Sequence, residues 1–90
     1  MSIPVSLVHC PSYRTKELER AVGEAFEQAG GLEVRGKRVL LKPNILRDAA
    51  PERAISTHPE FVRAVIRYVK SAGAARIMVG DSPGVHRGDF

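Results

Sequence analysis

Three short apolar runs alternate with two longer amphipathic stretches along the 90 residues of this chain. The apolar runs lie at residues 3–10, 39–41 and 75–79, and their length and their β-branched residues predict strands. The second and third runs show little alternation of apolar and polar residues, which is typical of strands buried on both faces of a parallel sheet.

The two stretches between these strands carry apolar residues at spacings of three and four, which predict amphipathic helices. The first helix is predicted to begin after the N-cap Thr15 and to end at Gly30–Gly31. The second is predicted to begin with a capping box formed by Thr57 and Glu60, and to end at Gly73. The predicted buried stripes are Leu18, Ala21, Val22, Ala25, Phe26 and Ala29 in the first helix, and Val62, Val65, Ile66, Val69 and Ala72 in the second.

The order strand, helix, strand, helix, strand predicts an α/β layer fold with a parallel sheet and right-handed crossovers. A sheet of three strands would leave apolar edges exposed, and natural proteins avoid such edges. We therefore predict a single domain over residues 1–90 that is an incomplete portion of a larger α/β domain. The remainder of the protein or a second copy would then lie along the sheet edge.

Polar residues follow the predicted strands, at the edge where open α/β sheets bind ligands. Lys42 and Asn44 follow the second strand, and Asp81 and Ser82 follow the third. The start of the second helix, Thr57–His58, comes close to the same edge, and a helix N-terminus favours an anion. These residues predict a phosphate or carboxylate pocket. The alternative is that they only cap a helix and form a turn, with the lysine solvated.

Three other kinds of site are not predicted. Residues 31–37 fit the phosphate-binding pattern G-x-x-x-x-G-K, but Arg38 follows instead of Ser or Thr, and the stretch precedes a strand. Residues 80–84 fit the hydrolase pattern G-x-S-x-G, but Pro83 lacks the N–H that would serve as an oxyanion donor. No pair of His, Cys or Asp residues has metal-ligand spacing on one element.

Composition narrows the choice of compartment and partner. The single cysteine, Cys10, excludes an internal disulfide and a four-cysteine cluster built from this chain alone, so we expect a cytoplasmic protein. No apolar run approaches the roughly 18 residues of a membrane-spanning helix, and no membrane partner is expected. The net charge of +4 suggests nucleic-acid binding, but the basic residues are spread along the chain and are not interleaved with aromatic residues, so no such partner is expected.

Four segments, in this order and at these separations, resemble the N-terminal part of the DUF362 family. They are 39–44 (Val-Leu-Leu-Lys-Pro-Asn), 57–60 (Thr-His-Pro-Glu), 72–74 (Ala-Gly-Ala) and 79–84 (Val-Gly-Asp-Ser-Pro-Gly). The resemblance implies a redox-linked or iron–sulfur-associated protein several times this length, because many members carry [4Fe–4S] cysteines further along the chain. Those cysteines are absent here, so the resemblance assigns a cluster to no residue of this chain.

The first interpretation is therefore an N-terminal fragment of a DUF362-like protein that forms part of a pocket for an anionic or metal-bound ligand. Lys42 would bind the anion, and Asp81 would be an acid/base or metal-facing carboxylate. The shared polar positions implied as ligand-binding are Lys42, Asn44, Thr57, His58 and Ser82. A second interpretation is a non-catalytic scaffold that pairs with a partner or a second copy through its sheet edge. A third is a nucleic-acid binder whose affinity falls steeply with salt.

Overall fold

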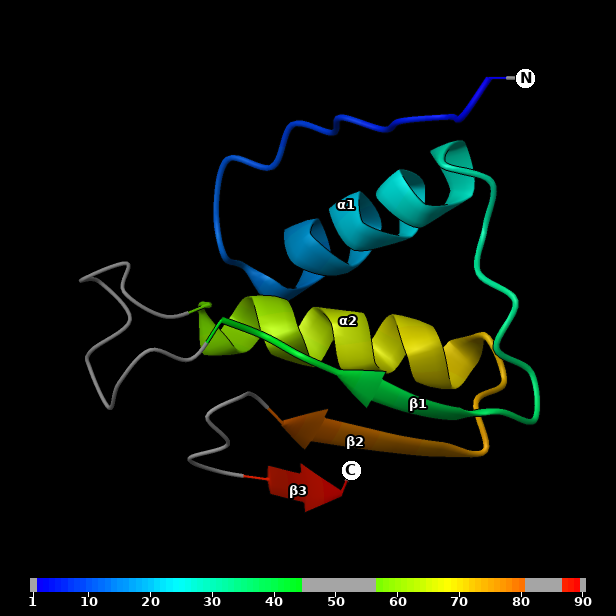
Figure 1. Cartoon of the computed structure of the whole chain (residues 1–90). Helices are drawn as coiled ribbons and strands as arrows, with labels where there is room; N and C mark the ends of the chain where they lie inside the picture. Colours follow the sequence, from blue (N-terminus) through cyan, green and yellow to red (C-terminus); the bar gives the residue numbers. More distant parts are fainter. Residues whose placement is uncertain (1, 45–56, 81–86, 90) are drawn as a thin grey trace.

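A computed structural model of the chain describes residues 2–44, 57–80 and 87–89. The predicted α/β class is confirmed: two helices lie on one side of a small sheet of strand order β1-β2-β3 (Figure 1). The elements, in chain order, are α1 (Thr15–Gln28), β1 (Arg38–Leu41), α2 (Pro59–Ser71), β2 (Arg76–Gly80) and β3 (Arg87–Asp89).

The sheet combines one parallel and one antiparallel pair. β1 and β2 are parallel, with Val39 opposite Ile77, and α2 lies in the connection between them as the strand–helix–strand pattern predicts. β3 pairs antiparallel with β2, with Gly88 opposite Val79. The sequence did not predict β3, because a strand of three residues is too short to show an alternation of apolar and polar positions.

The strand predicted at residues 3–10 is not formed. The segment is not part of the described sheet, although its burial alternates as in a strand. Ser6 and Val8 are half-buried, whereas the side chains of Val5 and Leu7 are 88% and 96% exposed. An apolar, β-branched run favours an extended backbone, but a strand also needs a neighbour to complete its hydrogen bonds. We call residues 3–10 the N-terminal arm.

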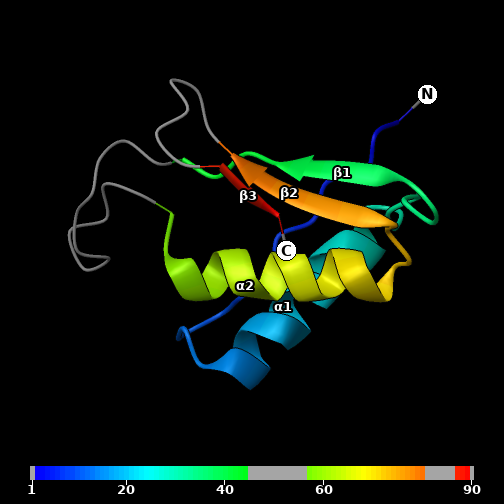
Figure 2. The same cartoon turned by 90° about the horizontal axis from the view of Figure 1, so that it is seen from below.

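The N-terminal arm is held by α1. The Ser6 hydroxyl donates a hydrogen bond to Gln28 Oε1 at 3.0 Å, and Arg20 Nη2 donates to the His9 carbonyl at 3.4 Å. In both overall views the arm runs past α1 in the same direction as β1 (Figures 1 and 2). The arm is therefore parallel to β1 and β2 without being part of the described sheet.

The sequence predicted the C-terminal end of α1 correctly but not its N-cap. The N-cap is Arg14 rather than Thr15, and no side chain caps the helix. Ser12 lies just before the helix start. Its hydroxyl accepts a hydrogen bond from the Arg14 N–H at 3.2 Å and donates one to the Glu17 carboxylate at 2.6 Å. The predicted glycine end is confirmed, because Gly30 has φ 107°, a backbone conformation that residues with a side chain rarely adopt.

Helix α2 lies between α1 and the sheet (Figure 2), and a buried cluster lies on each of its two sides. Leu18 and Val22 of α1 pack against Ala64 of α2. On the other side, Val69 of α2 packs against Ile77 of β2, and these two side chains are 1% and 2% exposed. The predicted stripe correctly contained Val69 but missed Ala64, because a single stripe describes a helix that is covered on one side only.

Polar and aromatic contacts also join α1 to α2. The Tyr68 hydroxyl donates to Glu27 Oε2 at 2.7 Å, and the Tyr68 ring stacks on Phe26 with the ring centroids 4.6 Å apart. The hydrogen bond to the Glu27 carboxylate raises the pKa of the Tyr68 hydroxyl, and burial and the charge of Glu27 add to the shift. The proton on Tyr68 is therefore held more tightly in the folded chain than in the unfolded chain.

This shift predicts a loss of stability in alkaline solution. Because the pKa is raised on folding, the stabilisation is fully present below the usual tyrosine pKa of about 10 and is lost as pH rises through the folded-state value. We expect Tyr68→Phe to destabilise the chain at pH 7, and to lose less stability than the wild type as the pH rises from about 10 through the folded-state pKa of Tyr68. Urea unfolding of both proteins from neutral to alkaline pH measures this. Parallel pH dependences would contradict the prediction.

Candidate functional site

The candidate site is the edge of the sheet where β1 and β2 end. Leu41, the last residue of β1, is opposite Val79, so Lys42 leaves the sheet beside Gly80, the last residue of β2. Lys42 is therefore at the predicted edge. Asp81 and Ser82 follow Gly80 in the sequence, and both lie outside the described residues.

Two hydrogen bonds join the end of β1 to the start of α2. The Asn44 N–H donates to Thr57 Oγ1 at 2.9 Å, and the Thr57 N–H donates to the Asn44 carbonyl at 2.8 Å. We call this pair of bonds the Asn44–Thr57 bracket. Asn44 and Thr57 are 13 positions apart in the sequence, and both were predicted to belong to the site. The bracket brings them into contact.

The bracket corrects the predicted capping box. The Thr57 hydroxyl bonds to Asn44, and the N-cap of α2 is His58, whose Nδ1 accepts from the Glu60 N–H at 3.1 Å. Glu60 is thus the second residue of the helix and not the third. Imidazole can replace the usual Thr or Ser here because its unprotonated nitrogen is also a hydrogen-bond acceptor.

The backbone N–H groups in the first turn of α2 already donate hydrogen bonds within the chain. Pro59 has no N–H, the Glu60 N–H is taken by the His58 ring, and the N–H groups of Phe61 and Val62 donate to the His58 carbonyl at 3.0 and 3.2 Å. An anion at this helix start would therefore be favoured by the helix dipole and by nearby side chains, rather than by free backbone donors.

An aromatic stack supports the His58 cap. The rings of Tyr13 and His58 lie 3.8 Å apart between centroids with 10° between their planes. Tyr13 lies two residues before the first residue of α1, so the stack joins the starts of both helices. Sequence reasoning did not assign Tyr13 to the site, because no local pattern relates residues that are so far apart in the chain.

A cavity of about 270 Å³ lies between the end of β1 and the first two turns of α2. Lys42 and Thr57 line it on the polar side, and Phe61 and Val65 line it on the apolar side. Lys42 is the one charged residue among the described residues that line the cavity. The sequence did not assign Phe61 to the site, although an aromatic residue beside the helix start was a usable signal.

The described residues do not fit a resident metal cluster. Within residues 2–44, 57–80 and 87–89, no three His, Cys, Asp or Glu side chains lie close enough to hold a metal ion. A [4Fe–4S] cluster takes four cysteine thiolates, and this chain has only Cys10, whose thiol donates to the Ser12 carbonyl at 3.2 Å. Across the same described segments, no helix is long and apolar enough to cross a membrane.

Comparison with known proteins decides the family. Residues 39–90, which contain the edge of the sheet and the whole of α2, match the family described as "Domain of unknown function (DUF362)". The chain belongs to the DUF362 family. The resemblance noted in the sequence is thereby confirmed.

The chain is also 42% identical over 82 residues to a thylakoid-associated protein of Synechocystis sp.. That similarity covers 88% of this DUF362 chain and 25% of the relative, so the chain spans about a quarter of the length of that protein. No solved structure matches the chain.

The His58 cap predicts a specific pattern of stability. We expect His58→Ala to lower the free energy of unfolding by about 0.5–2 kcal/mol, because the Glu60 N–H loses its acceptor. His58→Asn loses the Tyr13 stack equally but keeps a capping oxygen, so it should be more stable than the alanine variant. Urea unfolding at neutral pH measures the three proteins. Equal stability of the alanine and asparagine variants would show that the cap contributes nothing.

Proposed function

We propose that this chain is the N-terminal α/β portion of a larger DUF362 protein, and that the edge where β1 and β2 end forms part of a pocket for a small anionic or metal-bound ligand. The observation that carries the proposal is the position of Lys42, a charged residue in the lining of a cavity bounded by a strand end and a helix start. Open α/β sheets bind their ligands at this edge.

Each polar residue has a separate role in the proposed pocket. The Lys42 ammonium group carries up to three hydrogen-bond donors for a phosphate or carboxylate. The dipole of α2 adds about 0.3–1 kcal/mol of attraction for an anion near its first turn. Asn44, Thr57 and His58 shape the wall through the hydrogen bonds described above. Asp81 is proposed as an acid/base or metal-facing carboxylate, with Ser82 as a further ligand contact.

The complete protein is, in this proposal, a cytoplasmic, redox-linked and iron–sulfur-associated protein. Its [4Fe–4S] ligands would come from cysteines outside this chain, since the chain itself has one cysteine. Support comes from membership of the DUF362 family, and from a relative of which this chain spans only 25%. The pocket and the cluster would then belong to different parts of one polypeptide.

Removing the proposed charged groups tests the pocket. In the complete protein, we expect Lys42→Ala to weaken the binding of inorganic phosphate about 10- to 100-fold, because it removes a charge-assisted hydrogen bond of roughly 1.5–3 kcal/mol. Asp81→Ala should impair activity or the binding of a metal-bound ligand, because a carboxylate repels free phosphate, and neither variant should unfold. Titration calorimetry measures affinity, and thermal unfolding checks the fold. Lys16→Ala, on the exposed start of α1, is the matched control. Normal binding by both site variants would refute the assignment.

A second candidate is a non-catalytic module that pairs with a second copy through its sheet. The observation that favours it is the edge of β1, which pairs on one side only within the described sheet and carries Leu40 with 55% of its side chain exposed. This function predicts that the 90-residue chain alone is a stable oligomer. Size-exclusion chromatography with light scattering measures its mass, and a monomer would exclude the second candidate.

A further inference from the structure

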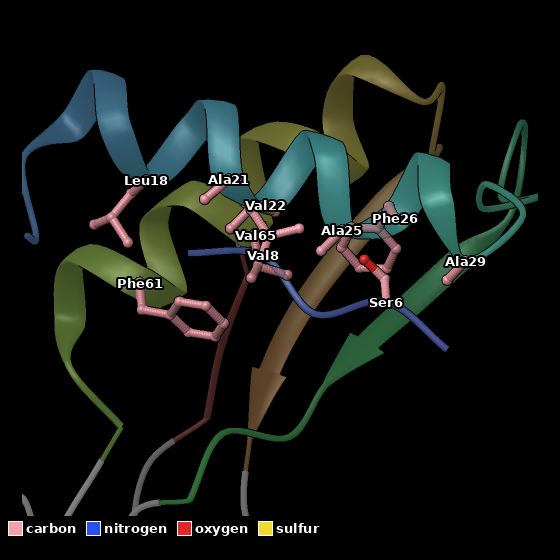
Figure 3. Close-up of a pocket in the computed structure, with 10 residues that line it drawn as sticks. All are labelled: Ser6, Val8, Leu18, Ala21, Val22, Ala25, Phe26, Ala29, Phe61 and Val65. Carbon is pink, nitrogen blue, oxygen red and sulfur yellow. The ribbon is translucent and has the colours of Figure 1, made fainter. Parts of the chain in front are cut away.

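An apolar groove of about 540 Å³ lies between the N-terminal arm, α1 and α2 (Figure 3). Leu18 and Phe26 of α1, Val8 of the arm, and Phe61 and Val65 of α2 contribute to its lining. The remaining lining residues are alanine, valine and one serine, and that serine is the arm residue whose hydroxyl already bonds to α1. The groove therefore favours an apolar occupant.

The arm contributes Ser6 and Val8 to the lining of the groove, whereas β1 lies outside the lining, and neither segment is paired on both sides within the described residues. The arm is extended and lies outside the described sheet, and β1 is an edge strand of that sheet. The arm and β1 run in the same direction in both overall views (Figures 1 and 2). Phe61 and Val65 line both the groove and the cavity at the end of β1, so the two spaces adjoin.

The dimensions of the groove suit one strand. Its α1 wall extends from Leu18 to Ala29, which is about 16 Å of helix at ~1.5 Å per residue. A strand of about five residues has this length at ~3.3 Å per residue, and five to six residues is the usual strand length. A strand here would bury its apolar side chains against α1 and offer its backbone to the arm on one side and to β1 on the other.

We propose that a β-strand from the remainder of the longer DUF362 polypeptide occupies this groove and pairs with β1, between β1 and the arm. The chain spans 25% of the length of its Synechocystis relative, so three quarters of that protein can supply the strand. Antiparallel pairing of two copies of β1 about Leu40 would instead place Arg38 opposite Lys42, and like charges directly opposite are destabilising. The proposal rests on the larger polypeptide of the proposed function and is independent of the Lys42 pocket.

A chimera tests the inserted strand. This chain replaces the matching 82-residue region of the Synechocystis relative, and hydrogen exchange is compared between the chimera and the isolated chain. We expect amides of the arm and the outward amides of β1 to exchange at least ~100-fold more slowly in the chimera, because ladder hydrogen bonds open only with local unfolding. Unchanged exchange in a folded chimera would overturn the proposal. If the chimera does not fold, the unmodified relative and its isolated matching segment give the same comparison.

A pair of variants in α1 tests whether the added strand occupies the groove. Ala25→Glu places a carboxylate in the groove lining and should abolish the added protection of the arm and β1 in the chimera. Gly23→Glu adds the same charge two positions away, where an added Cβ meets open space and no groove residue, and should leave the protection intact. Equal effects of the two substitutions would overturn the role of the groove.

Cysteine trapping separates an inserted strand from direct pairing of the arm with β1. Val5→Cys or Leu7→Cys is combined with Leu40→Cys in a Cys10→Ser chimera. One strand between them sets the arm and β1 roughly 10 Å apart, beyond the ~7 Å Cα separation that a disulfide bridges. We expect no disulfide under mild oxidation, and its formation would overturn the proposal. A dimer of the isolated chain with a protected arm would assign the groove to a second copy and would also overturn it.

Discussion

The fold depends on the burial of α2 on two sides. Ala64 faces α1 and Val69 faces the sheet, and the two clusters they belong to share no buried residue, so α2 is the element that connects them. A large-to-small substitution in a well-packed core costs about 2–5 kcal/mol for a leucine or isoleucine. In a chain this small, a loss of that size on either side of α2 would separate a whole layer from the rest.

The geometry of the candidate site also depends on α2. α2 begins beside the end of β1, and the Asn44–Thr57 bracket, the His58 cap and the Tyr13 stack all fix that starting point. Packing determines the direction of the helix, and the polar contacts determine where it begins. The position of Lys42 relative to the helix dipole follows from both, since Lys42 lies two residues before the bracket.

The sequence predicted the α/β class, two helices and two of the strands, because the helices carry apolar residues at spacings of three and four and the two strands are continuous apolar runs. It also placed Lys42, Asn44, Thr57 and His58 at one edge, because strand ends and helix starts meet there by topology. It assigned the cap to Thr57 and not to His58, since the choice depends on Asn44, which competes for the threonine hydroxyl. The arm at 3–10 was predicted as a strand because its short apolar run suits an extended backbone, but such a run does not reveal whether a neighbouring strand is present.

The Asn44–Thr57 bracket has a consequence for how this family can vary. Both hydrogen bonds join Asn44 to Thr57, the two residues on either side of the sequence between β1 and α2. They therefore hold the end of β1 next to the start of α2. Doubling the length of a flexible closed loop costs only about 0.6 kcal/mol. Insertions and deletions between these two anchors can therefore accumulate in evolution while the edge of the sheet keeps its shape.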